Sequence, residues 1–323
     1  MPLFTLSPAE QAIQDKVAKT YSAFPFPKRT ARGIFQRNQE FFTKLERVGV
    51  TPADIRGKRV LDAGCGTGEL ACLWASLGAE VTAIDIVKPS LEIAQRTARA
   101  AGVDITFHQG SLLEYPLPEQ AFDIVSSHMV LHHTADPARS FANIARCVKP
   151  GGLIFICVFG LWGRLILCRH PLWKIWLVHR LAGPDSTRRV RLAERWCYHP
   201  GEEAAHGLEQ EQYLYDLYGV AQVKHHTYGE MLRWFRDSGI AYVSSWPPME
   251  FRREYDTIMD GSHAARSPLG RLGRWGLQQP PVQAMARAQW ANRPGRMSRA
   301  LTQALAFVKS DSYMFNVLGR RPQ

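Results

Sequence analysis

Short apolar runs alternate with amphipathic segments through the middle of the chain. The segments between the runs, at about 68–77, 89–101 and 137–148, have helical composition. Asp136 precedes Pro137 at the start of the last of these, which is an N-cap followed by proline at the first helical position. Strands that alternate with helices predict a parallel sheet covered by helices, an α/β fold. The predicted strands are Arg59–Ala63, Glu80–Asp85, Ile105–Gln109, Phe122–Ser127 and Leu153–Phe159.

Helical patterns also precede this alternating region. Ser7–Glu10 is a capping box with proline at the first helical position, and it predicts a helix to about Tyr21. The sequence FPFPKR at 24–29 then breaks the helix. A second helix follows and carries an apolar face of Phe35, Phe41, Phe42 and Leu45. Thr51–Asp54 is another capping box before the first strand, so residues 1–57 predict an N-terminal helical cap.

The pattern loosens for nearly seventy residues after the fifth strand. It resumes at Thr227–Glu230, a third capping box that leads into a helix over 231–237. The composition of Ala241–Ser245 predicts a sixth strand, and that of Tyr313–Leu318 predicts a late seventh strand.

Residues 60–68 read Val-Leu-Asp-Ala-Gly-Cys-Gly-Thr-Gly, with Asp62 as the last carboxylate before three glycines at every second position. Glycine lets the backbone turn sharply and lets a ligand approach where a Cβ would collide. The helix that follows points its N-terminus at the same space. Strand, glycine turn and helix together indicate a nucleotide-type site at the carboxyl end of a parallel strand. The spacing is not the Gly-x-Gly-x-x-Gly of dinucleotide sites.

The segment VLDAGCGTGEL resembles motif I of the class I S-adenosylmethionine (SAM) dependent methyltransferases, and the resemblance extends over residues 58–158. VTAIDI at 81–86 resembles the second strand with its acidic end. HQGSLLEYPLPEQAFDIV, SSHMVLHHTADP and VKPGGLIFICVF follow in the family's order. YSAFPFPKR near the N-terminus and HHTYGEMLRWFRDSGI near residue 230 resemble a bacterial subset of the family.

This resemblance implies a Rossmann-like seven-stranded sheet that closes with an antiparallel pair. Residues 58–323 would then form the SAM-binding methyltransferase domain. Within it, 160–226 would be a lid or substrate-covering insertion, and 247–311 would be a basic insertion inside the antiparallel pair. Candidate pocket walls in the first insertion are the aromatic residues Trp162, Trp173, Trp176, Tyr213, Tyr215 and Tyr218, for which core packing is the alternative role.

The family resemblance also implies which residues bind the cofactor. Asp62 and the glycine turn would lie at the amino acid end of SAM, and Asp85 would accept the ribose hydroxyls beside Ile86 on the adenine. Ser111 stands where many members have an acidic residue, so either Ser111 or the backbone at Leu112 would meet the adenine amino group. The complete predicted set is Asp62, Gly64, Cys65, Gly66, Gly68, Asp85, Ile86, Ser111, Leu112 and Ser127.

The histidines after strand four are the candidate catalytic groups. His128, His132 and His133 fall in a segment that normally lines the methyl-transfer site, and histidine is the natural general base near neutral pH. The alternative is that a histidine here only holds the loop. A sulfur, nitrogen or carboxylate acceptor needs no base, because alignment then supplies most of the rate.

Tyr21 is a third candidate at the reaction centre. Folded over the sulfonium, its ring would attract the cation and exclude water, whereas packing in the cap is the alternative. The predicted catalytic residues are therefore His128, His133 and Tyr21. No metal site is predicted, since no suitable carboxylate spacing accompanies the histidine pair.

The net charge of +11 is unevenly distributed. Residues 1–57 sum to +4, residues 58–158 to −2 and residues 159–323 to +9. Between Asp260 and Asp311 the chain has no acidic residue but seven arginines and Lys309. This composition favours an anionic partner such as a carboxylate or phosphate substrate, RNA or an acidic carrier surface, and a solvated basic face is the alternative.

The remaining composition predicts a cytoplasmic protein. Six scattered cysteines without a Cys-x-x-Cys pair indicate neither a zinc site nor a disulfide framework, and they suit a reducing compartment. The first residues, MPLFTLSPAEQ, lack the features of a signal peptide. The longest apolar run, 153–167, is interrupted and shorter than the about 20 residues that a membrane span needs.

The sequence thus favours a methyltransferase that acts on a small-molecule acceptor in an enclosed pocket. An RNA or protein methyltransferase is a second hypothesis, supported by the basic C-terminal third but by no recognisable RNA-binding module. A third keeps SAM but replaces methyl transfer by intramolecular cyclisation or aminocarboxypropyl transfer, because one fold supports several chemistries. Binding of SAM without turnover is the fourth, and the complete motif I argues against it.

Overall fold

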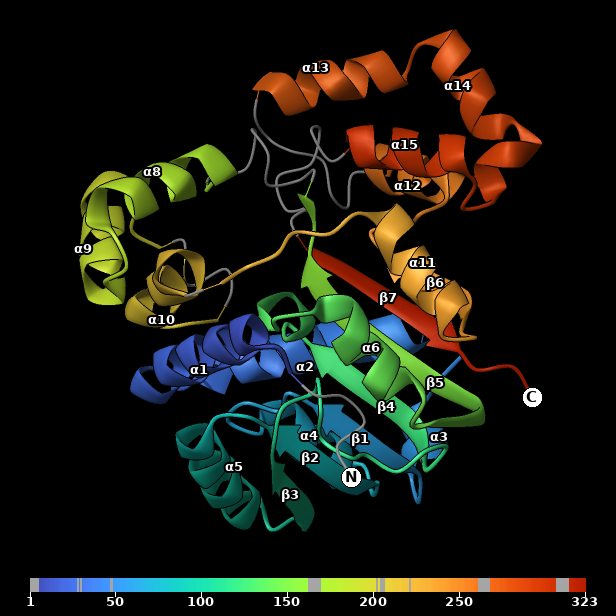
Figure 1. Cartoon of the computed structure of the whole chain (residues 1–323). Coiled ribbons are helices and arrows are strands. Elements are labelled where there is room, and N and C mark those ends of the chain that lie inside the picture. The colour runs from blue at the N-terminus through green and yellow to red at the C-terminus, as the bar shows by residue number, and fades with distance from the viewer. Residues whose placement is uncertain are drawn as a thin grey trace.

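The computed structural model describes residues 6–27, 29, 31–46, 49–161, 170–201, 203, 207–220, 222–260, 268–305 and 314–323. Seven strands form one sheet in the order β3-β2-β1-β4-β5-β7-β6 (Figure 1). Strands β1 to β5 run parallel, and β7 runs antiparallel to both β5 and β6. This confirms the Rossmann-like sheet with its closing antiparallel pair. The strands are β1 Arg59–Ala63, β2 Glu80–Asp85, β3 Ile105–Gln109, β4 Phe122–His128, β5 Val148–Phe159, β6 Ala241–Trp246 and β7 Met314–Arg320.

Helices cover both faces of the sheet because alternate residues of each strand point to opposite sides. On one face Leu61 and Ala63 pack with α6 (Pro137–Ala145) and α11 (Tyr228–Asp237). On the other face Val60 packs with α2, α4 and α5. These helices are α2 Ala31–Glu46, α4 Glu69–Ser76 and α5 Lys88–Ala101. Both faces are therefore buried, as a parallel sheet requires.

The N-terminal cap is helical, as the capping boxes predict. Helix α1 spans Pro8–Ala23, and the Ser7 hydroxyl accepts a hydrogen bond from the Glu10 backbone N–H at 3.3 Å. The Glu10 carboxylate accepts in return from the Ser7 N–H at 2.8 Å. Thr51 and Asp54 repeat the motif at α3 (Pro52–Ile55). In α2 the side chain of Phe35 lies outside the described residues.

The segment after β5 folds into a helical unit with its own apolar core. Its elements are α8 Leu172–Ala182, α9 Ser186–Trp196, α10 Gln210–Leu214 and a π-helix over Tyr215–Gly219. Tyr213 and Tyr218 are buried in this core. The unit contacts the N-terminal cap, since the ring of Tyr215 stacks on that of Phe24 with centroids 4.2 Å apart. Its role as a lid over a substrate stays a prediction.

A second helical unit lies between β6 and β7. It contains α12 Phe251–Met259, α13 Pro268–Leu277, α14 Pro280–Arg287, a 3-10 turn at Gln289–Asn292 and α15 Arg296–Leu305. Phe251, Ile258 and Leu305 belong to its separate apolar core. Residues 261–267 and 306–313 of the predicted insertion lie outside the described residues. In the part of the chain that the structure describes, no helix has the length and apolar character of a membrane span.

Candidate active site

The glycine turn joins β1 to α4 at the carboxyl edge of the sheet. The backbone N–H groups of Gly64 and Cys65 both donate to the Ile84 carbonyl, at 2.7 and 3.0 Å, which anchors the turn to β2. Gly64 and Gly66 have φ of +85° and +53°, in the left-handed region that favours glycine. A Cβ at Gly64 would collide with the Val130 side chain, and one at Gly66 would collide with the Phe26 carbonyl oxygen.

Gly68 serves a different purpose from the other two glycines. It is the N-cap of α4 with φ of +82°, and a Cβ there would lie 2.7 Å from the Cβ of Ala94 on α5. Gly68 therefore allows α4 and α5 to pack closely, and the structure does not place it in the cavity described next. The sequence spacing alone does not separate these two roles.

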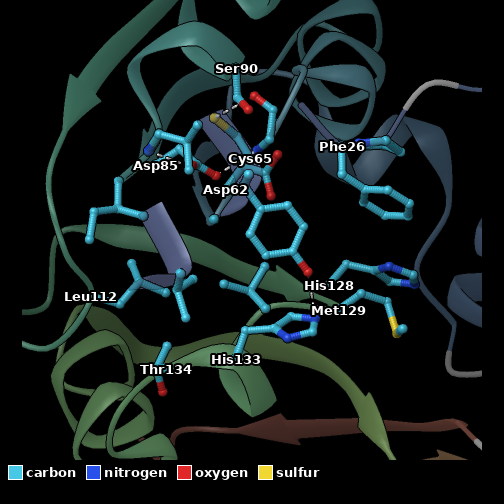
Figure 2. A pocket seen from close by; sticks show the side chains of 18 of the residues that line it. Phe26, Asp62, Cys65, Asp85, Ser90, Leu112, His128, Met129, His133 and Thr134 are labelled. Carbon is cyan, nitrogen blue, oxygen red and sulfur yellow. Dashed lines mark hydrogen bonds between the residues drawn. The ribbon is translucent and has the colours of Figure 1, made fainter. Parts of the chain in front are cut away.

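A cavity lies beyond the carboxyl ends of β1, β2 and β4 (Figure 2). Figure 2 shows the carboxylates of Asp62 and Asp85 toward one end and the rings of His128 and His133 toward the other. The structure brings together most of the predicted site residues around it. Those that line the cavity are Tyr21, Asp62, Gly64, Cys65, Gly66, Asp85, Ile86, Ser111, Leu112, His128 and His133.

Ser127 is a predicted site residue that lies behind the cavity wall. Its side chain is fully buried, and its hydroxyl donates to the Ala63 carbonyl at 2.9 Å. This bond links β4 to the end of β1 and so supports the glycine turn from below. The observed contact is structural, because no atom of Ser127 reaches the cavity lining.

Asp85 is held rigidly at the end of β2. One carboxylate oxygen accepts from the Gly66 N–H and the other from the Val87 N–H, both at 2.8 Å. Burial raises the pKa of Asp85 above its usual range, although the two backbone bonds act in the opposite direction. The carboxylate thus fixes the glycine turn in place while it faces the cavity.

The cavity is roofed by the N-terminal cap. The Thr67 hydroxyl donates to the Pro27 carbonyl at 2.6 Å, directly over the glycine turn. Arg29 forms an ion pair with Glu69 of α4 at 2.8 Å, and these side chains are only 12% and 7% exposed. Phe26 and Gln14 also face the cavity. Sequence reasoning missed the roles of Gln14, Phe26 and Arg29, and the signal for the last two was the YSAFPFPKR segment that contains them.

Tyr21 and His133 form a hydrogen-bonded pair inside the cavity. The Tyr21 oxygen lies 3.1 Å from His133 Nε2, and His133 Nδ1 lies 2.8 Å from the Gln222 carbonyl oxygen. Because a carbonyl only accepts, Nδ1 must carry a proton, and in the neutral ring Nε2 then accepts from the Tyr21 hydroxyl. Burial raises the pKa of Tyr21 well above its usual range, with Asp216 and Asp85 adding to the effect. The phenol therefore stays protonated near neutral pH.

The other two histidines after β4 differ in their surroundings. His128 lines the cavity, and its ring stacks against Phe155 with centroids 6.3 Å apart. His132 is fully buried outside the cavity lining, between the rings of His133 and Phe159. His132 therefore packs in the core.

The aromatic candidates of the first insertion that the structure describes do not line this cavity. Tyr213, Tyr215 and Tyr218 are buried within the insertion and beside the cap. Trp173 and Trp176 point outward and are largely exposed. Trp162 lies outside the described residues.

The chemistry of the cavity fits SAM. The glycine turn leaves room that a Cβ would fill, and the carboxylates of Asp62 and Asp85 suit an ammonium group and a ribose diol. The apolar side chains of Ile86 and Leu112 suit an adenine ring. Among the residues that the structure describes, no three histidine, cysteine, aspartate or glutamate side chains lie close enough together to hold a metal ion.

Comparisons with known proteins indicate the family of the domain that carries this cavity. Residues 61–156 match the family model described as a methyltransferase domain. The ubiquinone biosynthesis O-methyltransferase of Proteus mirabilis is 40% identical over 103 residues, which are 31% of this chain and 41% of that protein. A protein of Synechococcus sp. without an assigned function is 30% identical over 273 residues, 77% of this chain and 65% of that protein.

The chain therefore spans less than two thirds of the length of either curated relative. Among solved structures, the magnesium protoporphyrin IX methyltransferase of Synechocystis PCC 6803 aligns with a TM-score of 0.47 at 16% identity, over 73% of this chain and 91% of that one. The family match and the observed sheet order together identify residues 61–156 as a class I methyltransferase domain, whose cofactor is S-adenosylmethionine.

Proposed function

We propose that this protein transfers the methyl group of SAM to a small-molecule acceptor inside the roofed cavity. The observation that carries the proposal is the Tyr21–His133 pair, which faces the same cavity as the glycine turn and Asp85. The name of the Proteus mirabilis relative, an O-methyltransferase, supports an oxygen atom as the acceptor. A cavity that the N-terminal cap roofs favours a small molecule over a macromolecule.

Bound SAM supplies an electrophilic methyl group on a sulfonium. In this proposal Asp62 and the backbone at Gly64 and Gly66 hold the amino acid end. Asp85 accepts hydrogen bonds from the ribose hydroxyls, while Leu112 and the neighbouring Ile86 and Ser111 hold the adenine. Cys65 contributes only its backbone to the turn. Burial raises the pKa of its thiol well above the usual range, so the thiol stays neutral and takes no part in the proposed binding.

His133 is the proposed proton acceptor for an acceptor hydroxyl. Its Nδ1–H donates to the Gln222 carbonyl, so Nε2 is the basic atom and faces Tyr21. An acceptor hydroxyl that takes the place of the Tyr21 hydroxyl would give its proton to Nε2, and the Gln222 carbonyl would stabilise the resulting imidazolium. Tyr21 would keep the ring oriented before the acceptor binds, and His128 would contact the acceptor from the neighbouring wall.

The cap would exclude water from the reaction. The bonds from Thr67 to Pro27 and from Arg29 to Glu69 hold the segment around Phe26 over the glycine turn. Removing water strengthens the hydrogen bonds inside the cavity and prevents side reactions. For an acceptor that is already nucleophilic, orientation within this closed space would supply most of the rate.

A product analysis tests the proposal. The protein is incubated with SAM alone and then with phenolic, carboxylate and amine acceptors, and the nucleoside products are separated. S-adenosylhomocysteine that forms only with an acceptor supports methyl transfer. Formation of methylthioadenosine would instead indicate transfer or cyclisation of the alkyl arm of SAM and would contradict methyl transfer. Salt-sensitive RNA binding together with methylated RNA would show that the acceptor is a macromolecule.

A further inference from the structure

Helix α8 carries apolar side chains on both its inner and its outer side, although it lies at the surface. Val178 and Ala182 on its inner side are buried in the core of the first insertion. On its outer side Trp173 and Trp176, three residues apart, are 54% and 65% exposed. Large apolar side chains that gather on an exposed helix face often mark an interaction site. The outer face of α8 therefore has the character of an interaction surface.

Helix α13 repeats this arrangement in the second insertion. Leu272 and Trp275, again three residues apart, are 62% and 61% exposed, and Met297 of α15 is similarly exposed. Figure 1 shows α8 at the upper left and α13 at the top of the view, both on the side away from β1, β2 and β3. We refer to Trp173, Trp176, Leu272, Trp275 and Met297 as the tryptophan surface.

The elements that carry the tryptophan surface are strongly basic. Residues 172–196 contain six lysines and arginines against two acidic residues, and 268–305 contain six arginines and no acidic residue. Lys174 lies with its ammonium 5.9 Å from the centroid of the Trp173 ring. The slightly acidic core, residues 58–158, has the opposite balance. The positive charge of the molecule is thus concentrated on the same elements as its exposed indoles.

We propose that the tryptophan surface docks the protein onto an anionic lipid bilayer. Indole rings favour the boundary between headgroups and acyl chains because they join a large apolar body to one polar N–H. Lysine and arginine beside them are attracted to anionic headgroups. Two separate helices that each present an apolar pair with basic neighbours suit an extended flat surface, and each helix would lie on the membrane without crossing it.

The docking surface is connected to the candidate active site. His179 of α8 lies with Nε2 2.9 Å from the Tyr218 carbonyl oxygen, which fixes α8 on the π-helix. Trp176 also borders a cavity of about 370 Å³ whose lining includes Val223 and Gln222. The Gln222 carbonyl is the group that holds His133. A bilayer on this surface would lie beside a cavity that adjoins the proposed base.

Vesicle co-sedimentation of the full chain tests the proposal and does not depend on its enzymatic activity. We expect binding to phosphatidylcholine vesicles that contain phosphatidylglycerol, weak binding to phosphatidylcholine alone, and release by salt. The double variant Trp173→Ser/Trp176→Ser should bind about tenfold more weakly or worse. Val243→Ser removes an exposed apolar side chain from β6 and should bind like the wild type.

Calorimetric SAM binding verifies that the double variant is folded. Three results would overturn the proposal. They are the absence of binding to vesicles that contain phosphatidylglycerol, equal binding by the double variant, and a concentration-dependent dimer that only the double variant loses. The last would assign the tryptophan surface to a second copy of the chain.

Discussion

Asp85 occupies the position on which the cofactor assignment most depends. Its carboxylate accepts two backbone N–H groups and faces the cavity, yet burial holds its pKa above the usual range. The protonated form is therefore present at higher pH than for an ordinary aspartate, whose pKa is about 3.9. A protonated carboxyl offers fewer acceptor sites to a ribose diol than the carboxylate does.

We therefore expect SAM affinity to fall as the pH falls through the raised pKa of Asp85. The sign follows because ligand hydroxyls donate to the ionised form, so binding favours loss of the proton. Calorimetric titrations over the mildly acidic range would measure this. The variant Asp85→Asn should bind SAM weakly and show little dependence on pH over the same range. A wild-type affinity that does not change with pH there would show that Asp85 does not meet the ribose.

Tyr21→Phe tests whether the Tyr21–His133 hydrogen bond serves catalysis. The variant keeps the aromatic ring and removes the hydroxyl that donates to Nε2. We expect kcat/KM for the acceptor to fall about tenfold or more, because Tyr21 orients the His133 ring until the acceptor binds, while SAM affinity changes little. Tyr115→Phe is a matched control, because Tyr115 bonds His108 Nδ1 at 2.9 Å and neither residue lines the cavity. Equal activities of the two variants would assign Tyr21 to packing alone.

Gly66→Ala tests the close approach between the glycine turn and the roof. The new Cβ would collide with the Phe26 carbonyl oxygen in addition to straining the backbone. Gly102→Ala separates the two effects, because Gly102 has φ of +65° with no atom within 4 Å of such a Cβ. We expect Gly102→Ala to cost about 1–2 kcal/mol in urea unfolding. Gly66→Ala should cost more and also lose SAM binding. The same unfolding midpoint and SAM affinity in both variants would show that the roof does not rest on the turn.

At the scale of elements, the N-terminal cap is fastened to α4 by a nearly buried ion pair. Removing Arg29 takes a charged partner away from the nearly buried Glu69 carboxylate, and the loss of one partner of such a pair costs about 3–5 kcal/mol. We therefore expect Arg29→Met to destabilise the protein by about this amount and to weaken SAM binding, since Glu69 lines the cavity. Denaturant unfolding and calorimetry would measure the two effects.

The exposed pair Arg236–Asp237 provides the control for this change. Its side chains are 72% and 63% exposed, so Arg236→Met should cost less than about 1 kcal/mol. The double variant Arg29→Met/Glu69→Met should recover part of the stability, because both charges of the nearly buried pair are then replaced by apolar side chains. A loss in Arg29→Met no greater than that in Arg236→Met would mean that the ion pair does not hold the cap.

Local sequence signals predicted most of these elements but not the contacts between them. The capping boxes at Ser7 and Thr51 placed helix starts correctly because their hydrogen bonds span only three residues. Strand β5 begins at Val148, five residues before the predicted start. The segment Lys-Pro-Gly-Gly has turn composition, yet pairing with Phe122 of β4 and a register shift there accommodate it. Tertiary pairing overrides composition at this point.

The parts of the site that escaped prediction are long-range pairs. Arg29 and Glu69 are 40 residues apart, and Tyr21 and His133 are 112 residues apart. No periodicity connects positions so far apart in the chain. The sequence therefore indicated Tyr21 and His133 as separate candidates and did not predict their hydrogen bond. Gly68 shows the same limit, because its neighbour Ala94 belongs to the next helix. The family resemblance indicated the candidate site residues, and the packing of the folded chain determines which of them face the cavity.

At the scale of the whole molecule, the sheet and the second insertion are separable structures. Strand β7 lies between β5 and β6, so the last strand of the chain is internal to the sheet. Trp246 at the end of β6 pairs with Asn316 of β7, which means that the chain leaves and re-enters the sheet at neighbouring points. The helices between them have their own apolar core.

Replacing residues 251–312 by a short glycine-serine linker should therefore preserve the sheet and SAM binding. A linker is sufficient because the paired strand ends already lie together. Ending the chain at residue 312 should instead prevent folding, because it removes β7 and leaves β5 and β6 without the strand between them. Circular dichroism and SAM calorimetry distinguish the two outcomes.

The linker variant also divides the tryptophan surface. It lacks Leu272, Trp275 and Met297 but retains Trp173 and Trp176 on α8, so vesicle binding should weaken without disappearing. Adding Trp173→Ser/Trp176→Ser to it should remove the remainder. If the linker variant lost SAM binding while folded, the second insertion would have to support the cavity directly, and the separation of membrane docking from the cofactor site would be wrong.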